Sequence, residues 1–294
     1  MKKQMTRRSF LKRFTYGILG TLGLSGGTYY YSKHLEPTML SIKEDSIFSP
    51  KLPPAFENFK ILQFGDTHLG FHYDLGQFEE LIQLINEQKP DLVLFNGDLV
   101  DEPNMFPQIE FEACIQVLSK IKAPFGKYWV YGNHDHGGYG TETLNHVMEL
   151  SGFKLLKNES LPIQKDQSTI QLAGLDDVML GRPDLEETFK EANPEQFTIL
   201  MCHEPDFADH TVHYPVDIQF SGHSHGGQIQ IPFLGYLVTP PFAEKYVEGK
   251  YQIGSRPLQL FVTRGIGTTR LPFRFLCKPE INIYSLQQNR SEEL

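Results

Sequence analysis

The chain has 294 residues, of which 40% are hydrophobic, and this is enough for one large or two ordinary packed domains. Residues 1–34 contain seven Lys or Arg and no Asp or Glu, so the remainder holds 20 basic against 36 acidic residues, a formal charge of −16. A body this acidic would be repelled by a phosphate backbone, and we therefore expect no nucleic acid partner.

The N-terminal stretch "MTRRSFLKRF" is followed by a weakly apolar segment that five glycines interrupt. With Arg7 and Arg8 as the pair, it resembles a twin-arginine export signal, which implies the twin-arginine translocase as a transient partner and an extracytoplasmic, membrane- or wall-associated location. An ordinary membrane anchor is the alternative. No A-x-A cleavage site follows, so an uncut anchor also stays open.

Residues 35–58 mix Pro, Ser and charged residues, and we expect a linker or an edge hairpin there. One domain follows over 59–286, and 287–294 form a polar tail. Short apolar runs in this domain predict strands. They are "FKILQF", "DLVLF", "KYWVY", "TIQLAG", "FTILMC", "DIQF", "QIQI", "LQLFV" and "INIYSL".

Helices are predicted between several of these strands. Phe78, Leu81, Ile82 and Ile85 repeat at helical spacing, and a second stripe runs from Phe111 to Leu118. A third helix is expected around Leu144 to Met148, and a fourth begins at Asp184 with acidic residues in its first turn. Strands and helices alternate early and strands dominate late, which favours an α/β fold.

Three cysteines lie far apart, at Cys114, Cys202 and Cys277, without CxxC spacing. This odd count predicts neither a disulfide framework nor a zinc finger. Cys114 falls on an apolar helical face and Cys202 on a predicted strand, so both are expected in the core.

Five predicted strands run directly into turns that carry metal-ligand residue types. Because ligand sites of α/β proteins lie at the carboxyl ends of strands, these turns can converge on one crevice. The two histidines of the last turn are at i and i+2, which places both on one side of an extended backbone. The turns are "ILQFGDTH" (Asp66, His68), "LVLFNGDLVD" (Asp98, Asp101), "YWVYGNHDH" (Asn133, His134, Asp135), "ILMCHEPD" (His203) and "IQFSGHSH" (His223, His225).

In this order the turns reproduce the motifs D-x-H, G-D-x-x-D, G-N-H-[DE], H and G-H-x-H, and the chain resembles the calcineurin-like metallophosphoesterases over about 220 residues. "GNHDHGGYGT" and "TRLPFRFLCKPE" resemble exported bacterial members. The resemblance implies a four-layer α/β/β/α sandwich of two mixed β-sheets flanked by helices. It also implies two divalent metal ions.

By this resemblance Asp66, His68 and His225 would hold one ion, and Asn133, His203 and His223 the other, with Asp98 between them. Carboxylate, amide and imidazole ligands without thiolate favour Mn, Fe or Zn. Two such ions can share a hydroxide that attacks a phosphate ester. His134 would face the leaving group, oriented by Asp101 or, as a second candidate, by Asp135.

Substrate recognition is less visible in the sequence. Arg264, Arg270 and Arg274 fall in one late loop and suit a phosphate group, although solvated surface arginines are an equal alternative. Residues 231–242 form an apolar, Pro-rich insertion that is either a core loop or a lip for a lipid-bearing substrate.

Three functions stay open beside hydrolysis of an envelope phosphate ester. Relatives with this arrangement include UDP-2,3-diacylglucosamine pyrophosphatases, so a lipid-linked pyrophosphate is one alternative substrate. A phosphoesterase fold used as a protein-binding scaffold is a non-enzymatic alternative, and metal storage at the cell wall is another.

Overall fold

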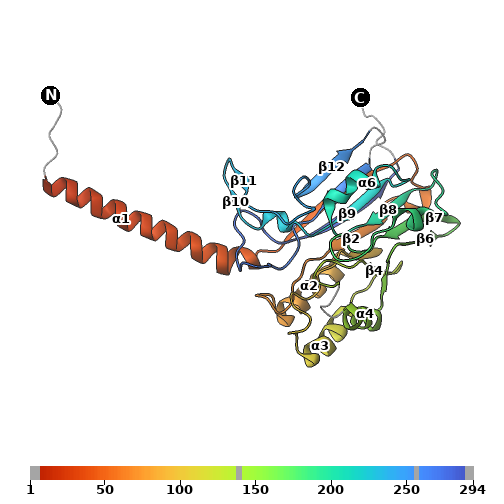
Figure 1. The fold of residues 1–294 in the computed structure, drawn as a ribbon, viewed down its shortest axis with the longest axis horizontal. Coiled ribbons are helices and arrows are strands. Elements are labelled where there is room, and N and C mark those ends of the chain that lie inside the picture. Colours follow the sequence, from red (N-terminus) through yellow and green to blue (C-terminus); the bar gives the residue numbers. More distant parts are fainter. Residues whose placement is uncertain (1–6, 137–140, 255–257, 289–294) are drawn as a thin grey trace.

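A computed structural model describes residues 7–136, 141–254 and 258–288. Its body is a sandwich of two six-stranded mixed sheets, as the family resemblance implied (Figure 1). The first sheet has the order β1 (Ser41–Phe48), β14 (Glu280–Gln287), β2 (Lys60–Phe64), β3 (Leu92–Phe95), β4 (Lys127–Trp129) and β5 (Phe153–Leu155). The second has the order β12 (Gly249–Ile253), β13 (Leu258–Val262), β9 (Ile218–Ser221), β8 (Thr198–Met201), β7 (Ser168–Gly174) and β6 (Glu159–Lys165).

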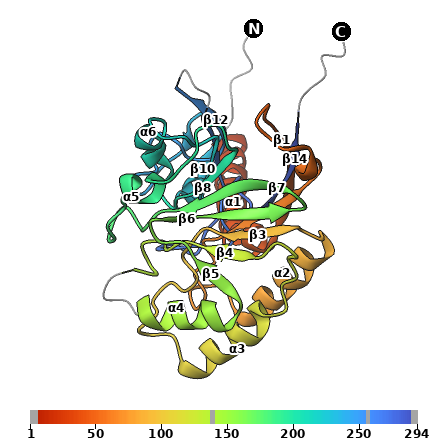
Figure 2. The ribbon, with the colours of Figure 1, turned by 90° about the vertical axis from the view of Figure 1, so that its right-hand side faces the viewer.

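Helices cover the outer face of each sheet, so the body has four layers (Figure 2). The first sheet carries α2 (Leu75–Glu87), α3 (Gln108–Leu118) and α4 (Thr141–Leu150), and the second carries α5 (Leu185–Phe189) and α6 (Ala208–Thr211). Three clusters of buried side chains fill the spaces between successive layers. The predicted four-layer α/β/β/α sandwich is confirmed.

Local sequence explains why α2 packs as it does. Asp74 caps the first turn because its side chain accepts from the backbone nitrogen of Gln77. The Gln77 side chain in turn accepts from the backbone nitrogen of Asp74, which completes a capping box. The predicted stripe Phe78, Leu81, Ile82 and Ile85 is fully buried against the first sheet.

The central strands β2, β3, β8 and β9 are buried on both faces, which is why they read as continuous apolar runs in the sequence. All nine predicted strand segments contain strand residues, although "QIQI" contributes only β10 (Gln230–Ile231), which pairs with β11 (Gly235–Tyr236) in a small separate hairpin. Cys114 and Cys202 are buried in the core as predicted, and all three cysteines are free.

The N-terminal segment leaves the body as α1 (Arg7–Tyr30), which projects away from the sandwich (Figure 1). Among the residues that the structure describes, no helix combines the length and apolar character needed to cross a membrane. Within the predicted linker or hairpin, β1 instead forms an edge strand that pairs in parallel with β14. The predicted tail is described only as far as residue 288, and the rest of it lies outside the described residues.

Candidate metal centre

The predicted ligands leave the two sheets at the same end. In the first sheet Phe64 is paired with Phe95, so the turns after β2 and β3 leave side by side. In the second sheet Met201 is paired with Phe220, so the turns after β8 and β9 do the same. Parallel neighbours therefore bring ligand residues distant in sequence to one edge of the sandwich.

Five of the predicted ligands have backbone angles in the left-handed region, which non-glycine residues rarely adopt. Their φ values are 50° at Asp66, 44° at His68, 58° at Asp98, 67° at His223 and 50° at His225. Each such conformation costs about 1–3 kcal/mol and persists only when its surroundings enforce it, so strain of this kind is concentrated at functional sites. Here it turns the side chains inward from the strand ends.

Two glycines make room for the ligands. A Cβ at Gly132 would collide with the Asp98 carboxylate and the His203 ring, and a Cβ at Gly222 would collide with the Asp66 carboxylate. Any larger residue at either position would displace a ligand group.

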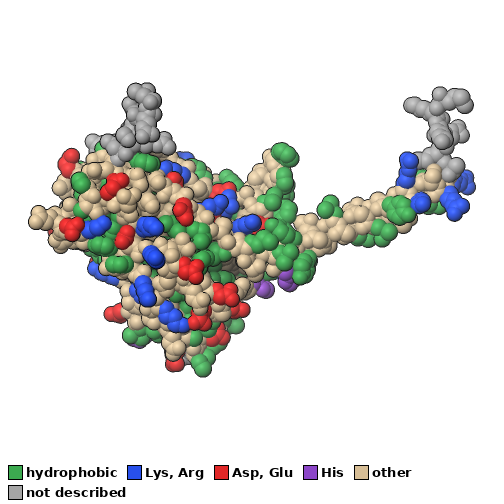
Figure 3. Space-filling model, turned by 180° about the vertical axis from the view of Figure 1, so that it is seen from behind, with side chains coloured by type: hydrophobic (Ala, Val, Ile, Leu, Met, Phe, Trp, Pro, Cys, Tyr) green, Lys and Arg blue, Asp and Glu red, His purple; other side chains and the backbone are tan. Residues whose placement is uncertain are grey.

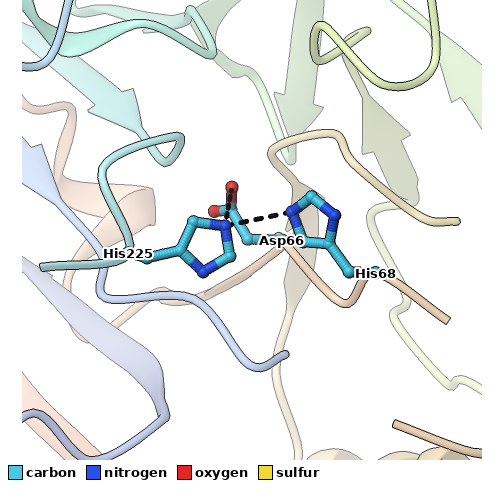
Figure 4. A group of neighbouring side chains, drawn as sticks. All are labelled: Asp66, His68 and His225. Atoms are coloured by element: carbon cyan, nitrogen blue, oxygen red, sulfur yellow. Dashed lines mark hydrogen bonds and ion pairs between the residues drawn. The ribbon is translucent and has the colours of Figure 1, made fainter. Parts of the chain in front are cut away.

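One cluster consists of Asp66, His68 and His225, all buried (Figure 4). The Nε2 atom of His225 lies 3.0 Å from Nε2 of His68 and 3.7 Å from Oδ1 of Asp66. The Asp66 carboxylate also accepts from the backbone nitrogen of His223, which joins the first turn to the last. Three donor groups thus face one point.

A second cluster consists of Asp98, His203 and His223, also buried. Oδ2 of Asp98 lies 3.3 Å from Nε2 of His203 and 3.4 Å from Nε2 of His68. The carboxylate of Asp98 therefore lies between the two clusters. Asn133, the seventh predicted ligand, lines the same cavity as Asp98 and His223.

Hydrogen bonds to oxygen fix which imidazole nitrogen three of the four ligand histidines present to the site. Backbone carbonyls and ionised carboxylates only accept, so the ring nitrogen bonded to them carries the proton and the other is left as a ligand atom. These bonds run from His203 Nδ1 to the Asn96 carbonyl (2.5 Å), from His223 Nε2 to the Pro241 carbonyl (2.9 Å) and from His68 Nδ1 to the Asp101 carboxylate (2.8 Å).

Some buried polar atoms of the clusters have no hydrogen-bond partner within the described part of the chain. They include Nε2 of His203 and Oδ1 of Asn133. Buried polar groups are normally paired, and an unpaired set of imidazole and amide donors around two carboxylates is what a cation requires. The seven residues therefore fit a pair of divalent metal ions.

The charges of the two buried aspartates are governed by different surroundings. Burial raises the pKa of the Asp66 carboxyl to about 6, despite the opposing effect of His203. For Asp98 burial acts in the same direction, but His203, His134 and His68 outweigh it and hold its pKa well below the usual value. Asp98 is therefore the anionic centre around which the histidines gather.

His134 lies at the edge of the centre, and the backbone of Asp101 rather than its carboxylate orients it. Its Nδ1 is 2.6 Å from the backbone carbonyl of Asp101, while the Asp101 carboxylate is 3.7 Å away and bonds to His68 instead. Asp98 and Asp101 raise the His134 pKa against the effect of burial. Asp101 thus orients two histidines, one through its side chain and one through its backbone.

Asp135, the second candidate for orienting His134, has a different task. Its buried carboxylate accepts from the backbone nitrogens of Asp98 (2.5 Å), Leu99 (3.0 Å) and Gly132 (3.0 Å). It therefore ties the turn after β3 to the turn after β4, and the suggestion that it holds His134 is wrong.

The site opens into a cavity of about 260 Å³ with an apolar wall. Of the three predicted substrate arginines, only Arg270 lines it. Arg264 is paired with Glu248 at 2.6 Å, outside this cavity. Arg274 is fully buried and donates to the backbone carbonyls of Gly267, Cys277, Arg264 and Gly265. A role in substrate binding is therefore wrong for Arg264 and Arg274.

Sequence reasoning missed the groups that hold the two sheets together beside the site. Asn96 and Gln63, both fully buried, donate to the carbonyls of Phe220 and Ser221 across the sandwich, each at 2.9 Å. Asn96 also accepts from His203 through its carbonyl. The sequence signal for Asn96 was a polar residue directly after the apolar run in "LVLFNGD". This pattern is also typical of an ordinary turn, so it did not predict a bond between the sheets.

Residues 59–227 match the family model described as Calcineurin-like phosphoesterase. The chain belongs to the calcineurin-like phosphoesterase family. The resemblance expected from the five turns is confirmed, and the chain is a metal-dependent phosphoric ester hydrolase.

Individual relatives extend over nearly the whole chain. The metallophosphoesterase YkuE of Bacillus subtilis is 47% identical over 97% of this chain and 99% of its own length. The phosphodiesterase YaeI of Escherichia coli is 29% identical over 94% of this chain and 98% of its own. The UDP-2,3-diacylglucosamine pyrophosphatase LpxG of Chlamydia trachomatis is 27% identical over 86% and 91%.

Proposed function

We propose that the protein hydrolyses a phosphate ester with two divalent cations held by Asp66, His68, Asp98, Asn133, His203, His223 and His225. The observation that carries the proposal is the position of Asp98. Its carboxylate lies within 3.4 Å of a histidine from each cluster, so one anionic side chain serves both ion positions.

Two ions held there would lower the pKa of the attacking water and stabilise charge on the phosphoryl oxygens. The donor set is mixed nitrogen and oxygen without sulfur, which supports Mn, Fe or Zn. The protein contributes hydrogen bonds that fix the tautomers of His68, His203 and His223. These histidines therefore need no reorientation when a cation binds.

His134 is proposed to donate a proton to the leaving oxygen. Its Nδ1 is bound by the Asp101 carbonyl, which leaves Nε2 as the nitrogen available to substrate, and its pKa is raised by Asp98 and Asp101. A histidine with a raised pKa is a suitable general acid near neutral pH.

His134→Ala tests this assignment in protein loaded with Mn²⁺. We expect both ions to remain bound and turnover of bis-p-nitrophenyl phosphate to fall about 10²- to 10⁴-fold, the range typical of a lost general acid. His146→Ala, at an exposed position on α4, should retain wild-type turnover. A His134→Ala protein with two ions and wild-type turnover would remove His134 from the mechanism.

A lipid-linked pyrophosphate is a second candidate substrate. Leu237, Val238 and Leu271 line the cavity beside Arg270, so an acyl chain and a phosphate could be held together. The relative LpxG is described as acting on UDP-2,3-diacylglucosamine. Arg270→Gln should then lower turnover of this acylated substrate more than that of bis-p-nitrophenyl phosphate, and equal losses on both would count against it.

We further propose export through the twin-arginine pathway, on the support of the Arg7–Arg8 pair and the basic, acid-free N-terminus. Replacing both arginines with lysine in a producing bacterium should retain the protein in the cytoplasm. Unchanged appearance in the envelope fraction would contradict this route.

A further inference from the structure

The β10–β11 hairpin and the residues after it present large apolar side chains to solvent. We call Phe233, Leu234, Leu237 and Val238 the apolar lip. Phe233 is 109% exposed and Leu234 74% exposed, so the fold leaves both uncovered. Figure 3 shows hydrophobic side chains gathered on this side of the body, next to the base of α1. Exposed apolar patches of this kind mark interaction surfaces.

The apolar lip continues into the catalytic cavity. Leu237 and Val238 belong both to the exposed lip and to the cavity wall, and Leu271, 54% exposed, lines the cavity as well. Whatever covers the lip therefore also meets the mouth of the metal centre.

Residues 269–277, which we call the strap, join the lip to the N-terminal segment. Phe275 exchanges backbone hydrogen bonds with the hairpin, accepting from Gln230 at 2.8 Å and donating to Gln228 at 2.9 Å. The next residue back, Arg274, donates its backbone N–H to Ser32 at 2.9 Å. The lip, the strap and the base of the N-terminal helix therefore form one connected edge.

Aromatic contacts reinforce this connection. The rings of Tyr29 and Phe273 are 5.4 Å apart, edge to face, and those of Tyr31 and Phe275 are 6.4 Å apart. Amphipathic tyrosines beside apolar side chains are typical of a protein surface that lies at a membrane interface.

The charge distribution along this edge differs from that of the rest of the molecule. Residues 228–243 and 265–278 contain no Asp or Glu, and neither do residues 1–34, whereas the body after residue 34 has a formal charge of −16. An anionic lipid surface would repel the acidic remainder of the body but not this acid-free edge, and it would attract the Lys and Arg residues in the first half of α1, at the end away from the body.

We propose that the apolar lip docks on an anionic lipid bilayer and places the mouth of the catalytic cavity at the membrane surface. This assigns an interaction surface beyond the proposed hydrolysis. The docking does not depend on the chemistry, so the two proposals can fail separately.

Binding of the full-length protein to vesicles tests the docking directly. The probes are vesicles of phosphatidylglycerol and phosphatidylcholine in equal parts, and vesicles of phosphatidylcholine alone. We expect binding to both, tighter to the anionic vesicles, and a loss of affinity of at least about tenfold in Phe233→Ser/Leu234→Ser, since two large apolar side chains no longer enter the interface.

Met105→Ser/Ile109→Ser is the matched control, because these side chains are 77% and 75% exposed but lie outside the lip. We expect it to bind vesicles as the wild type does. Both double variants should hydrolyse bis-p-nitrophenyl phosphate at the wild-type rate, so a failure of catalysis is read separately from a failure of docking.

A spectroscopic arm locates the contact. Trp129, the single tryptophan, is fully buried, so Phe233→Trp adds one responsive fluorophore. Its emission should shift to shorter wavelength on anionic vesicles and be quenched by brominated acyl chains. Three results would overturn the proposal: wild-type protein that ignores vesicles, equal binding by Phe233→Ser/Leu234→Ser, or emission from the introduced tryptophan that brominated chains do not quench. A wild-type dimer that this double variant dissociates would overturn it as well.

Discussion

Asp66 is a fully buried carboxyl group that a cation would neutralise. Without metal, burial raises its pKa to about 6 from the ordinary 3.8. A carboxyl group whose pKa is higher in the folded protein than in the unfolded chain favours folding at pH values below the unfolded-state pKa. This contribution is lost as the pH rises through about 6. At pH 7.5 the ionised group therefore opposes folding of the metal-free protein, by about 3 kcal/mol for a shift of two units.

Asp66→Asn removes this penalty together with a metal ligand. In EDTA at pH 7.5 we expect the variant to melt at a higher temperature than the wild type, and at pH 4 the difference should disappear because the wild-type carboxyl is protonated there. Mn²⁺ should raise the melting temperature of the wild type more than that of the variant, which keeps only the second cluster of ligands intact. Thermal unfolding at both pH values measures this, and a variant that is less stable at pH 7.5 would contradict the assigned burial cost.

At the scale of elements, the turns after the strands carry both the proposed metal ligands and the residues that hydrogen-bond to them. The ligand residues could be predicted because each turn is a short local pattern following an apolar run. The inter-sheet bonds of Asn96 and Gln63 could not, because each joins residues more than 120 positions apart. Whether residues 35–58 form a linker or an edge hairpin could not be decided from sequence for a similar reason, since the charged strand β1 is stabilised by pairing with β14 at the other end of the chain.

Gly132→Ala tests how closely two turns approach. Its Cβ would collide with the Asp98 carboxylate and the His203 ring, both proposed ligands. We expect at least one of two Mn²⁺ ions to be lost and turnover to fall by about 10²-fold, as is typical when catalytic groups are displaced by about an ångström. Gly76→Ala, in the first turn of α2, should leave Mn²⁺ content unchanged. Full metal content in Gly132→Ala would show that the turns tolerate the shift.

At the scale of the whole molecule, the buried Arg274 side chain holds together the late loop of residues 264–277, whose backbone contacts the N-terminal segment through the bond from Arg274 N–H to Ser32. Sequence could not distinguish it from Arg264 and Arg270, because the three share one loop and one side-chain type while only the fold decides which is buried. Its guanidinium bonds to four backbone carbonyls, all from residues 264–277. Its own burial lowers its pKa, which shows the cost that these bonds offset.

Arg274→Met should therefore lower the free energy of unfolding by about 3–5 kcal/mol, since several buried carbonyls lose their partner. Arg264→Met, which breaks a partly exposed pair with Glu248, should cost about 1 kcal/mol or less. Urea denaturation followed by fluorescence of the buried Trp129 compares the two. Equal losses would show that burial does not separate the roles of these arginines.

The central claim is that one carboxylate, Asp98, joins two metal positions. Equilibrium dialysis against Mn²⁺, with metal content determined for the wild type and for Asp98→Ala, measures this most directly. We predict two ions per wild-type chain and weakened binding of both in the variant, with loss of bis-p-nitrophenyl phosphate hydrolysis. A single ion in the wild type, or two tightly bound ions in Asp98→Ala, would contradict the shared site.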